Sequence, residues 1–326
     1  MTDTSDQLIE AFDARALRRN ERREFFRTAL GAGAIAAAGA AALAWEASAT
    51  AQTVTDADVL NFALNLEYLE ANFYSWAAYG TGISSDMMSG TGTQGTVSGG
   101  AQVSFTDPVV KAYAREIAQD EINHVNFLRT VLGSSAVAQP AIDLSSGATS
   151  AFSKAAQAAG IVAAGASFNA FANDENFLLA AFLFEDVGVT AYKGAVPLIT
   201  SVAYMQAAAG ILATEAYHAA IVRSTLYAKG VATPSYRTDA DDISDARDAL
   251  DGTATDLDQG ISPVAASTGS GTASNVTPTD TNGLVYSRST GQVLNIAYLS
   301  DTAVAKGGFF PNGFNGNIVN SAASAS

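Results

Sequence analysis

The chain has no cysteine, and this absence restricts the chemistry that it can support. Disulfides, iron–sulfur clusters and thiolate metal sites all need cysteine, so none of them can form. Any bound metal must therefore be held by oxygen and imidazole ligands. A redox protein of this composition must also take its electrons from another molecule, because it cannot carry a cysteine-ligated iron domain of its own.

Basic residues and histidine are also scarce. The 326 residues include 17 Lys and Arg against 32 Asp and Glu, a formal net charge of -15. Nucleic acid is excluded as a partner, since binding a phosphate backbone needs a basic face. We interpret the acidic balance as a means of solubility. Only two histidines are present, so their positions are informative.

The first 51 residues resemble a bacterial twin-arginine (Tat) export signal. The pair Arg22-Arg23 is followed by Glu24, Phe25-Phe26 and Arg27, and an Ala/Gly-rich run extends from Thr28 to Leu43. This run is shorter than the roughly 20 residues that a membrane-spanning helix needs, and Ala49-Thr50-Ala51 fits a cleavage site. Residues 1–51 are thus predicted to be a Tat signal peptide, with the periplasm as the destination. A retained membrane anchor is the alternative. No later continuous apolar run of that length exists, so the mature form is expected to have no transmembrane domain.

Four long amphipathic stretches follow, separated by Gly- and Ser-rich connectors. Apolar residues at helical spacing predict helices over 56–79, 108–132, 174–196 and 199–229. Asp107 before Pro108 is typical of a helix start, and Gly80 and Gly230 of helix ends. We therefore predict an all-α four-helix bundle over residues 52–230. A long surface loop covers 80–106, and one or two short helices lie within 149–172.

Residues 231–326 differ in composition and contain neither Glu nor His. Eight aspartates fall within 239–258 in a spacing that matches no calcium loop, so we interpret this stretch as acidic surface rather than a calcium site. Ser289 and Gln292 form a capping-box pattern that predicts a short helix over 289–299. We expect this C-terminal extension to serve packing on the bundle or contact in a homo-oligomer, not catalysis.

Both histidines occur in the same local motif. Glu121 precedes His124 by three residues on the second predicted helix, and Glu215 precedes His218 by three on the fourth. Positions i and i+3 share one helix face, so each pair presents a carboxylate and an imidazole to the same point. One such pair carries little weight, but two pairs that use every histidine predict a metal site.

The first and third helices carry a matching glutamate each. Glu67 has Tyr74 seven residues later, and Glu185 has Tyr192 seven later, both in apolar stretches. This indicates an internal duplication of a helix pair. The alignment of the two copies puts Gly188 opposite Glu70, so Glu67 is predicted to be the ligand and Glu70 to hydrogen-bond a ligand or line the route to the metals.

This pattern resembles the ferritin-like di-iron carboxylate proteins, in which two helices each supply one Glu and two others each supply Glu-x-x-His. The segments LNLEYLEANFY and GGFFPNGFNG look like those of bacterial proteins related to plant desiccation-related proteins. The resemblance implies a centre of two iron or manganese ions. It implies bridging by Glu121 and Glu215, terminal carboxylates from Glu67 and Glu185, and one metal for each of His124 and His218.

The resemblance also implies residues that support the ligands. Asp120 is expected to accept the second N–H of the histidine on the opposite helix, whereas its counterpart in the second copy, Thr214, is a weaker acceptor. We interpret Tyr68, Tyr74, Tyr192 and Tyr217 as core or supporting residues rather than redox centres.

We weigh three functions for such a centre. The first is an enzyme whose metals react with dioxygen or peroxide, with an external electron donor if the reaction needs one. The second is a structural protein that protects against oxidative or desiccation stress and whose metal site is not catalytic. In the alternative without a metal site, the glutamates and histidines are polar residues of amphipathic helices. The third, iron storage, does not fit the long loop and the C-terminal extension.

Overall fold

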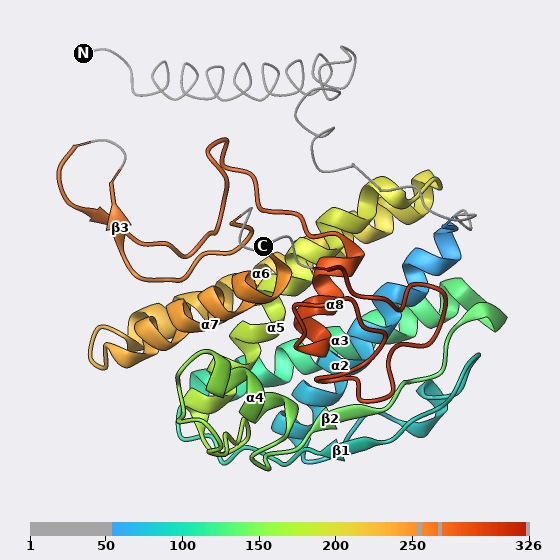
Figure 1. Ribbon diagram of the computed structural model, residues 1–326, viewed down its shortest axis with the longest axis horizontal. Helices are drawn as coiled ribbons and strands as arrows, with labels where there is room; N and C mark the ends of the chain where they lie inside the picture. Colours follow the sequence, from blue (N-terminus) through green and yellow to red (C-terminus); the bar gives the residue numbers. More distant parts are fainter. Residues whose placement is uncertain (1–53, 253–255, 267–268, 324–326) are drawn as a thin grey trace, which may run out of the picture. The chain divides into compact units, whose positions relative to one another are not determined.

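Four long helices form the centre of the molecule. The computed structural model describes residues 54–252, 256–266 and 269–323, so the predicted Tat signal peptide lies outside the described residues. The long helices are α2 (Asp56–Tyr79), α3 (Pro108–Leu132), α5 (Asp174–Ala195) and α6 (Val202–Lys229) (Figure 1). The predicted all-α fold is confirmed, and α2 and α3 have the bounds that the sequence predicts.

The helix ends follow from local side-chain chemistry. Thr55 and Asp58 form a capping box at the start of α2, and Gly80 ends that helix with a left-handed backbone. Asp107 caps α3 ahead of Pro108. Helix α6 begins three residues later than predicted, because a 3₁₀ turn, η5 (Val196–Leu198), follows α5 and Ser201 supplies the cap.

The bundle consists of two helix pairs. Helix α2 packs most extensively on α3, and α5 on α6. Helices α2 and α5 are buried on nearly every side, whereas α3 and α6 each bury only one face. A helix that is apolar on every side must be shielded from water on every side. Further elements must therefore pack on the outer sides of α2 and α5.

The first cover is formed by the loops after α2 and α3. The loop after α2 contains η3 (Ser85–Met87) and β1 (Val97–Gly99), which pairs in parallel with β2 (Ile142–Leu144) so that Val97 lies opposite Ile142. At Gly95 an added Cβ would come within 2.1 Å of the Ala141 backbone nitrogen. Glycine at this position thus lets the loop pack closely against the segment that contains Ala141. One short helix, α4 (Ala151–Ala158), occupies the Ala-rich connector.

The C-terminal extension provides the second cover. It contains α7 (Ser235–Asp251), a hairpin of β3 (Val264–Ala265) and β4 (Thr272–Ala273), and α8 (Thr290–Tyr298) (Figure 1). Helix α8 has the capping box of Ser289 and Gln292 that the sequence predicts. The aromatic tail is buried, and the ring of Phe309 lies 4.9 Å from that of Phe184 on α5. In the part of the chain that the structure describes, no helix combines the length and apolar character needed to cross a membrane.

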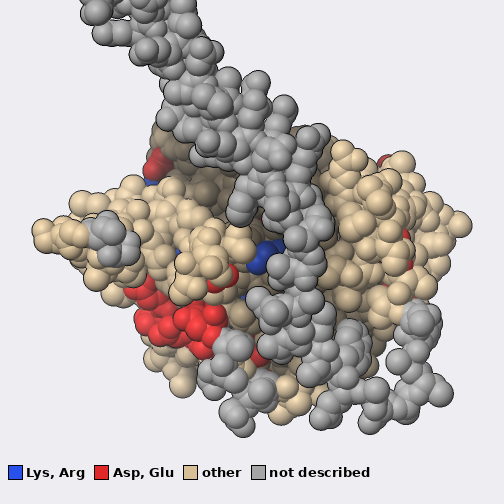
Figure 2. Space-filling view, turned by 90° about the horizontal axis from the view of Figure 1, so that it is seen from above, with Lys and Arg blue, Asp and Glu red and all other residues tan. Residues whose placement is uncertain are grey.

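The interpretation of residues 239–258 as acidic surface is only partly correct. Figure 2 shows a patch of acidic side chains on one face of the molecule, and Asp242, Asp245 and Asp256 of this stretch are exposed. Asp251 and Asp258, however, are buried and paired with arginine. The reason is that α7 presents one face to the bundle, marked by buried residues at helical spacing: Ala240, Ile243, Ser244, Arg247 and Asp251.

The buried aspartates belong to a network of charges that joins the extension to the bundle. Arg247 of α7 contacts Asp258 at 2.6 Å and Asp186 of α5 at 2.9 Å. Arg288, just before α8, contacts Asp258 at 2.8 Å, and Arg223 of α6 contacts Asp186 at 2.7 Å. Arg288 also pairs with Asp251, so three arginines balance three aspartates in charge, as a buried ion cluster requires. Charges at positions far apart in the chain hold α5, α6, α7 and the start of α8 together.

Candidate metal centre

The six residues that the sequence predicts as ligands meet inside the bundle. All are buried, with between 0% and 8% of each residue exposed. Helix α2 supplies Glu67, α3 supplies Glu121 and His124, α5 supplies Glu185, and α6 supplies Glu215 and His218. Each of the four helices therefore contributes at least one carboxylate to a common point.

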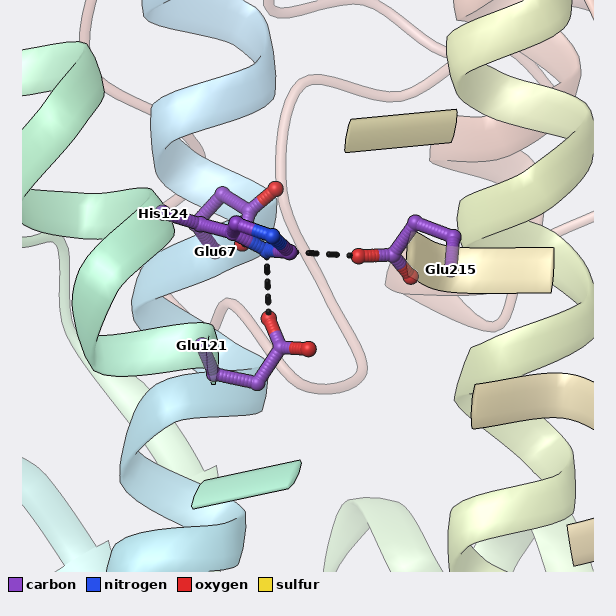
Figure 3. Close-up of side chains that lie close together, drawn as sticks. All are labelled: Glu67, Glu121, His124 and Glu215. Atoms are coloured by element: carbon purple, nitrogen blue, oxygen red, sulfur yellow. Dashed lines mark hydrogen bonds and ion pairs between the residues drawn. The ribbon is translucent and has the colours of Figure 1, made fainter. Parts of the chain in front are cut away.

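The ligand atoms divide into two groups, each within 4.8 Å of one another. The first group contains Glu67, Glu121, His124 and Glu215 (Figure 3), and the second contains Glu121, Glu185 and His218. Each group holds one histidine, as the resemblance implies. Glu121 belongs to both groups, whereas Glu215 falls in the first group only.

Short distances join the two histidines to the carboxylates. His124 Nδ1 lies 3.2 Å from Glu67 Oε2, and it lies 3.4 Å from Glu121 Oε2. His218 Nδ1 lies 3.0 Å from Glu121 Oε1. The two oxygens of Glu121 thus face different histidines, which is the geometry that a carboxylate between two metal ions needs.

The donor set fits two divalent cations. Within the described part of the chain, several buried atoms of the site have no hydrogen-bond partner, and these are both oxygens of Glu121 and of Glu215, Oε2 of Glu185 and Nδ1 of His218. Buried polar atoms are rarely left in this condition, because each costs about 1–3 kcal/mol. Carboxylate oxygen with imidazole nitrogen suits iron or manganese, and two such ions would balance four carboxylate charges.

The protonation equilibria of the site reflect several buried acids close together. Burial raises the pKa of Glu67 to about 7 and that of Glu185 to about 8. Burial also raises the pKa of Glu215 well above its usual range, with the Glu121 charge adding to the effect. Although burial opposes it, contacts with both histidines hold the pKa of Glu121 below its usual value. Glu121 is thus the carboxylate that keeps its charge most readily.

A surrounding set of side chains orients the ligands. Tyr74 donates a hydrogen bond to Glu185, and Tyr192 donates one to Glu67. His218 Nε2 lies 3.2 Å from Asp120 Oδ2, which confirms the predicted contact between Asp120 and the histidine of the opposite helix. The Thr214 hydroxyl instead bonds the Gly210 carbonyl of its own helix, so the two halves differ as expected.

Other tyrosines lie away from the site. Tyr68 is buried, and its hydroxyl donates to the carbonyls of Met87 and Val137. Tyr217 is 73% exposed, so the prediction of a core or supporting role is wrong for this residue. It sits one position before His218, and the helix turns it outward when His218 points in.

Glu70 is a fifth buried acid at the site but belongs to neither ligand group. An added Cβ at Gly188 would come within 2.4 Å of Glu215 Oε2 and 3.6 Å of Glu70 Oε1. Gly188 thus gives the Glu215 carboxylate room, and Glu70 lies beside the same point. The arginines that contact Asp186, next to Glu185, cannot be predicted from the sequence, because they lie far apart along the chain.

Comparisons with known proteins agree with this geometry. A family model described as a ferritin-like domain matches residues 55–228. The ferritin-like catalase Nec2 of Nesocodon mauritianus is 29% identical over 269 residues, which are 81% of this chain and 84% of that protein. The desiccation-related protein PCC13-62 of Craterostigma plantagineum is 35% identical over 178 residues, 53% of each chain.

Proposed function

The chain belongs to the ferritin-like domain family, and from this we propose that its bundle binds two iron or manganese ions that decompose hydrogen peroxide. The observation that carries the proposal is the position of Glu121, whose two oxygens lie 3.0 and 3.4 Å from different histidines. A carboxylate shared in this way supports a pair of ions rather than a single one.

Decomposition of peroxide balances without any further reactant. Two molecules of hydrogen peroxide give two of water and one of dioxygen, so one peroxide supplies the two electrons and two protons that the other consumes. When bound, an iron or manganese pair would supply the change in oxidation state by two electrons that this reaction needs. An external electron donor is then unnecessary, whereas a reaction with dioxygen would require one. The relative named as a catalase supports this choice of oxidant.

The residues of the chain bind the ions and exclude water from them. Tyr74 and Tyr192 fix Glu185 and Glu67 in position, and Asp120 orients His218. The 0–8% exposure of the ligands keeps bulk water from the site, and in that environment charge interactions act more strongly than in water.

The test is metal loading followed by a gas measurement. Protein freed of metal by chelation and reloaded with manganese or iron should bind about two ions per chain. It should release dioxygen from hydrogen peroxide, one molecule for every two consumed. Glu121→Gln should lose metal and activity together, and Glu116→Gln, at an exposed position of the same helix, should keep both.

Two results would contradict the proposal in different ways. A chain that takes up neither iron nor manganese would overturn the metal centre itself. A chain that holds two ions but leaves peroxide unchanged would favour a structural role in stress protection, which the similarity to a desiccation-related protein supports.

A further inference from the structure

A small apolar cavity is lined by Glu70, Gly188 and Tyr192, which neighbour the proposed metal centre. It measures about 30 Å³ and is lined by residues of α2, α5 and the C-terminal extension. Most of its lining is apolar and includes Leu66, Leu183, Val293, Ile296 and Phe309. Of its described lining residues, only Glu70 carries a carboxyl group.

Two lining positions connect the cavity to the proposed ligands. At Gly188, which lines the cavity, the place of a Cβ lies 2.4 Å from Glu215 Oε2, although Glu215 itself does not line the cavity. Tyr192 lines the cavity and donates its hydrogen bond to Glu67. A molecule held in the cavity would thus contact Gly188 and Tyr192, each of which also neighbours a carboxylate of the first ligand group.

The size of the cavity limits what it can hold. A water molecule needs roughly 10–15 Å³ of such space, so 30 Å³ accommodates about two water-sized units. Hydrogen peroxide and dioxygen each have two heavy atoms, both oxygen, and match this size. The apolar lining suits dioxygen, and the Glu70 carboxyl offers peroxide a hydrogen-bonding partner.

We propose that this cavity holds the peroxide substrate and the dioxygen product beside the metal centre, and that the C-terminal extension sets its size limit. This proposal rests on the proposed function. It limits the substrates of that function to oxidants with two heavy atoms. Organic peroxides that carry bulky carbon groups are excluded by the wall that α8 and Phe309 form.

This wall is held firmly against the bundle. The Arg288 backbone N–H donates to the Thr190 carbonyl at 3.1 Å, and its guanidinium donates to the Thr190 hydroxyl at 3.0 Å. The ring of Phe309 packs between Phe184 and Phe152 at centroid distances of 4.9 and 5.0 Å. Since close-packed side chains give way little, the cavity keeps its volume.

Two substitutions in α8 change that volume without touching a proposed ligand. Ile296→Ala enlarges the cavity, and Ala297→Leu fills it. Leu294→Ala is the matched control for the first, because Leu294 is buried in the same helix but does not line the cavity. Metal content should stay at about two ions per chain in all three variants.

The first measurement compares hydrogen peroxide with tert-butyl hydroperoxide as kcat/KM. Ile296→Ala should raise the relative rate of the bulky peroxide by about tenfold or more, and Ala297→Leu should slow hydrogen peroxide by about tenfold. Leu294→Ala should leave the ratio of the two peroxides unchanged. A metal-loaded wild type that consumes hydrogen peroxide, with the same ratio in Ile296→Ala as in Leu294→Ala, would overturn the role of the cavity alone.

The second measurement needs neither metal nor activity. Crystals of the wild type under xenon pressure should show xenon in the cavity, and crystals of Ala297→Leu should not, since apolar cavities bind this gas. Absence of xenon from the wild type would overturn the proposal. A wild type inert to both peroxides would overturn the proposed function and this role of the cavity with it.

Discussion

Tyr192 on α5 donates a hydrogen bond to Glu67 on α2, across the centre of the bundle. Tyr74 on α2 donates the reciprocal bond to Glu185 on α5. Each tyrosine follows the glutamate of its own helix by seven residues, which is about two turns or ~10.5 Å of helix. Each helix thus supplies the tyrosine that binds the glutamate of the other helix, as expected for copies related by an approximate two-fold axis.

Loss of either tyrosine hydroxyl should weaken metal binding. In Tyr192→Phe and in Tyr74→Phe a carboxylate loses the partner that orients it, and affinity for manganese should fall by about 10–100-fold in a competition titration. Tyr298→Phe is the control, because that buried hydroxyl donates to the Val319 carbonyl away from the centre. Wild-type affinity in both tyrosine variants of the site would contradict the orienting role.

Glu67 and Glu70 should differ in their effect on metal content. Glu67→Ala should lose at least one ion per chain, because its carboxylate contacts His124 at 3.2 Å within the first ligand group. Glu70→Ala should keep both ions and show altered reactivity, since Glu70 lines the cavity instead. Elemental analysis of the purified variants measures the difference, and the reverse pattern would refute the assignment.

Metal binding should strengthen as pH rises. Glu67 and Glu185 have pKa values of about 7 and about 8, and the facing carboxylates raise the pKa of His218 to about 9 in spite of its burial. These groups must release protons to bind metal. Manganese uptake should therefore be weak at pH 5.5 and strong at pH 8, with protons released into an unbuffered solution.

The metal-free protein should show the opposite trend in stability. Above the ordinary carboxyl pKa of 4.5 the unfolded chain has released protons that Glu67 and Glu185 still hold in the folded chain. The protons on Glu67 and Glu185 therefore stabilise the folded chain. This stabilisation is complete below pH 4.5 and is lost as pH rises through about 7 and 8. The Tm gained on loading with manganese should thus be larger at pH 8 than at pH 5.5. A gain that shrinks between these values would contradict the prediction.

Export should depend on the arginine pair of the predicted signal. Replacement of Arg22 and Arg23 by lysine should leave the protein in the cytoplasm, because the Tat route is read from paired arginines. Fractionation of cells followed by immunoblotting measures the distribution. An unchanged periplasmic level would show that residues 1–51 are not a Tat signal.

Much of the bundle is encoded locally and could be predicted. The caps at Thr55, Asp107 and Ser289 act within three residues of themselves, so the helix starts of α2, α3 and α8 follow from the sequence. The i,i+3 spacing of glutamate and histidine likewise fixes a shared helix face whatever surrounds it. The convergence of the four helices came from the family resemblance, since no local rule brings separate helices together.

Other features needed the packed chain. The seven-residue spacing of Glu67 and Tyr74 indicates a repeat, but the partner of each tyrosine lies on the other helix pair. The sequence shows Asp251 and Asp258 as members of an acidic run, and only burial against Arg247 and Arg288 distinguishes them from their exposed neighbours.

The cavity beside Glu70 is decided by tertiary structure alone. Its walls come from residues as distant as Leu66 and Phe309, and its volume is the space that their packing leaves. Spacing along a chain determines which side chains share a face, because helix geometry is regular over a few residues. It does not determine which faces meet, because burial and charge pairing depend on every segment that competes for the same surface.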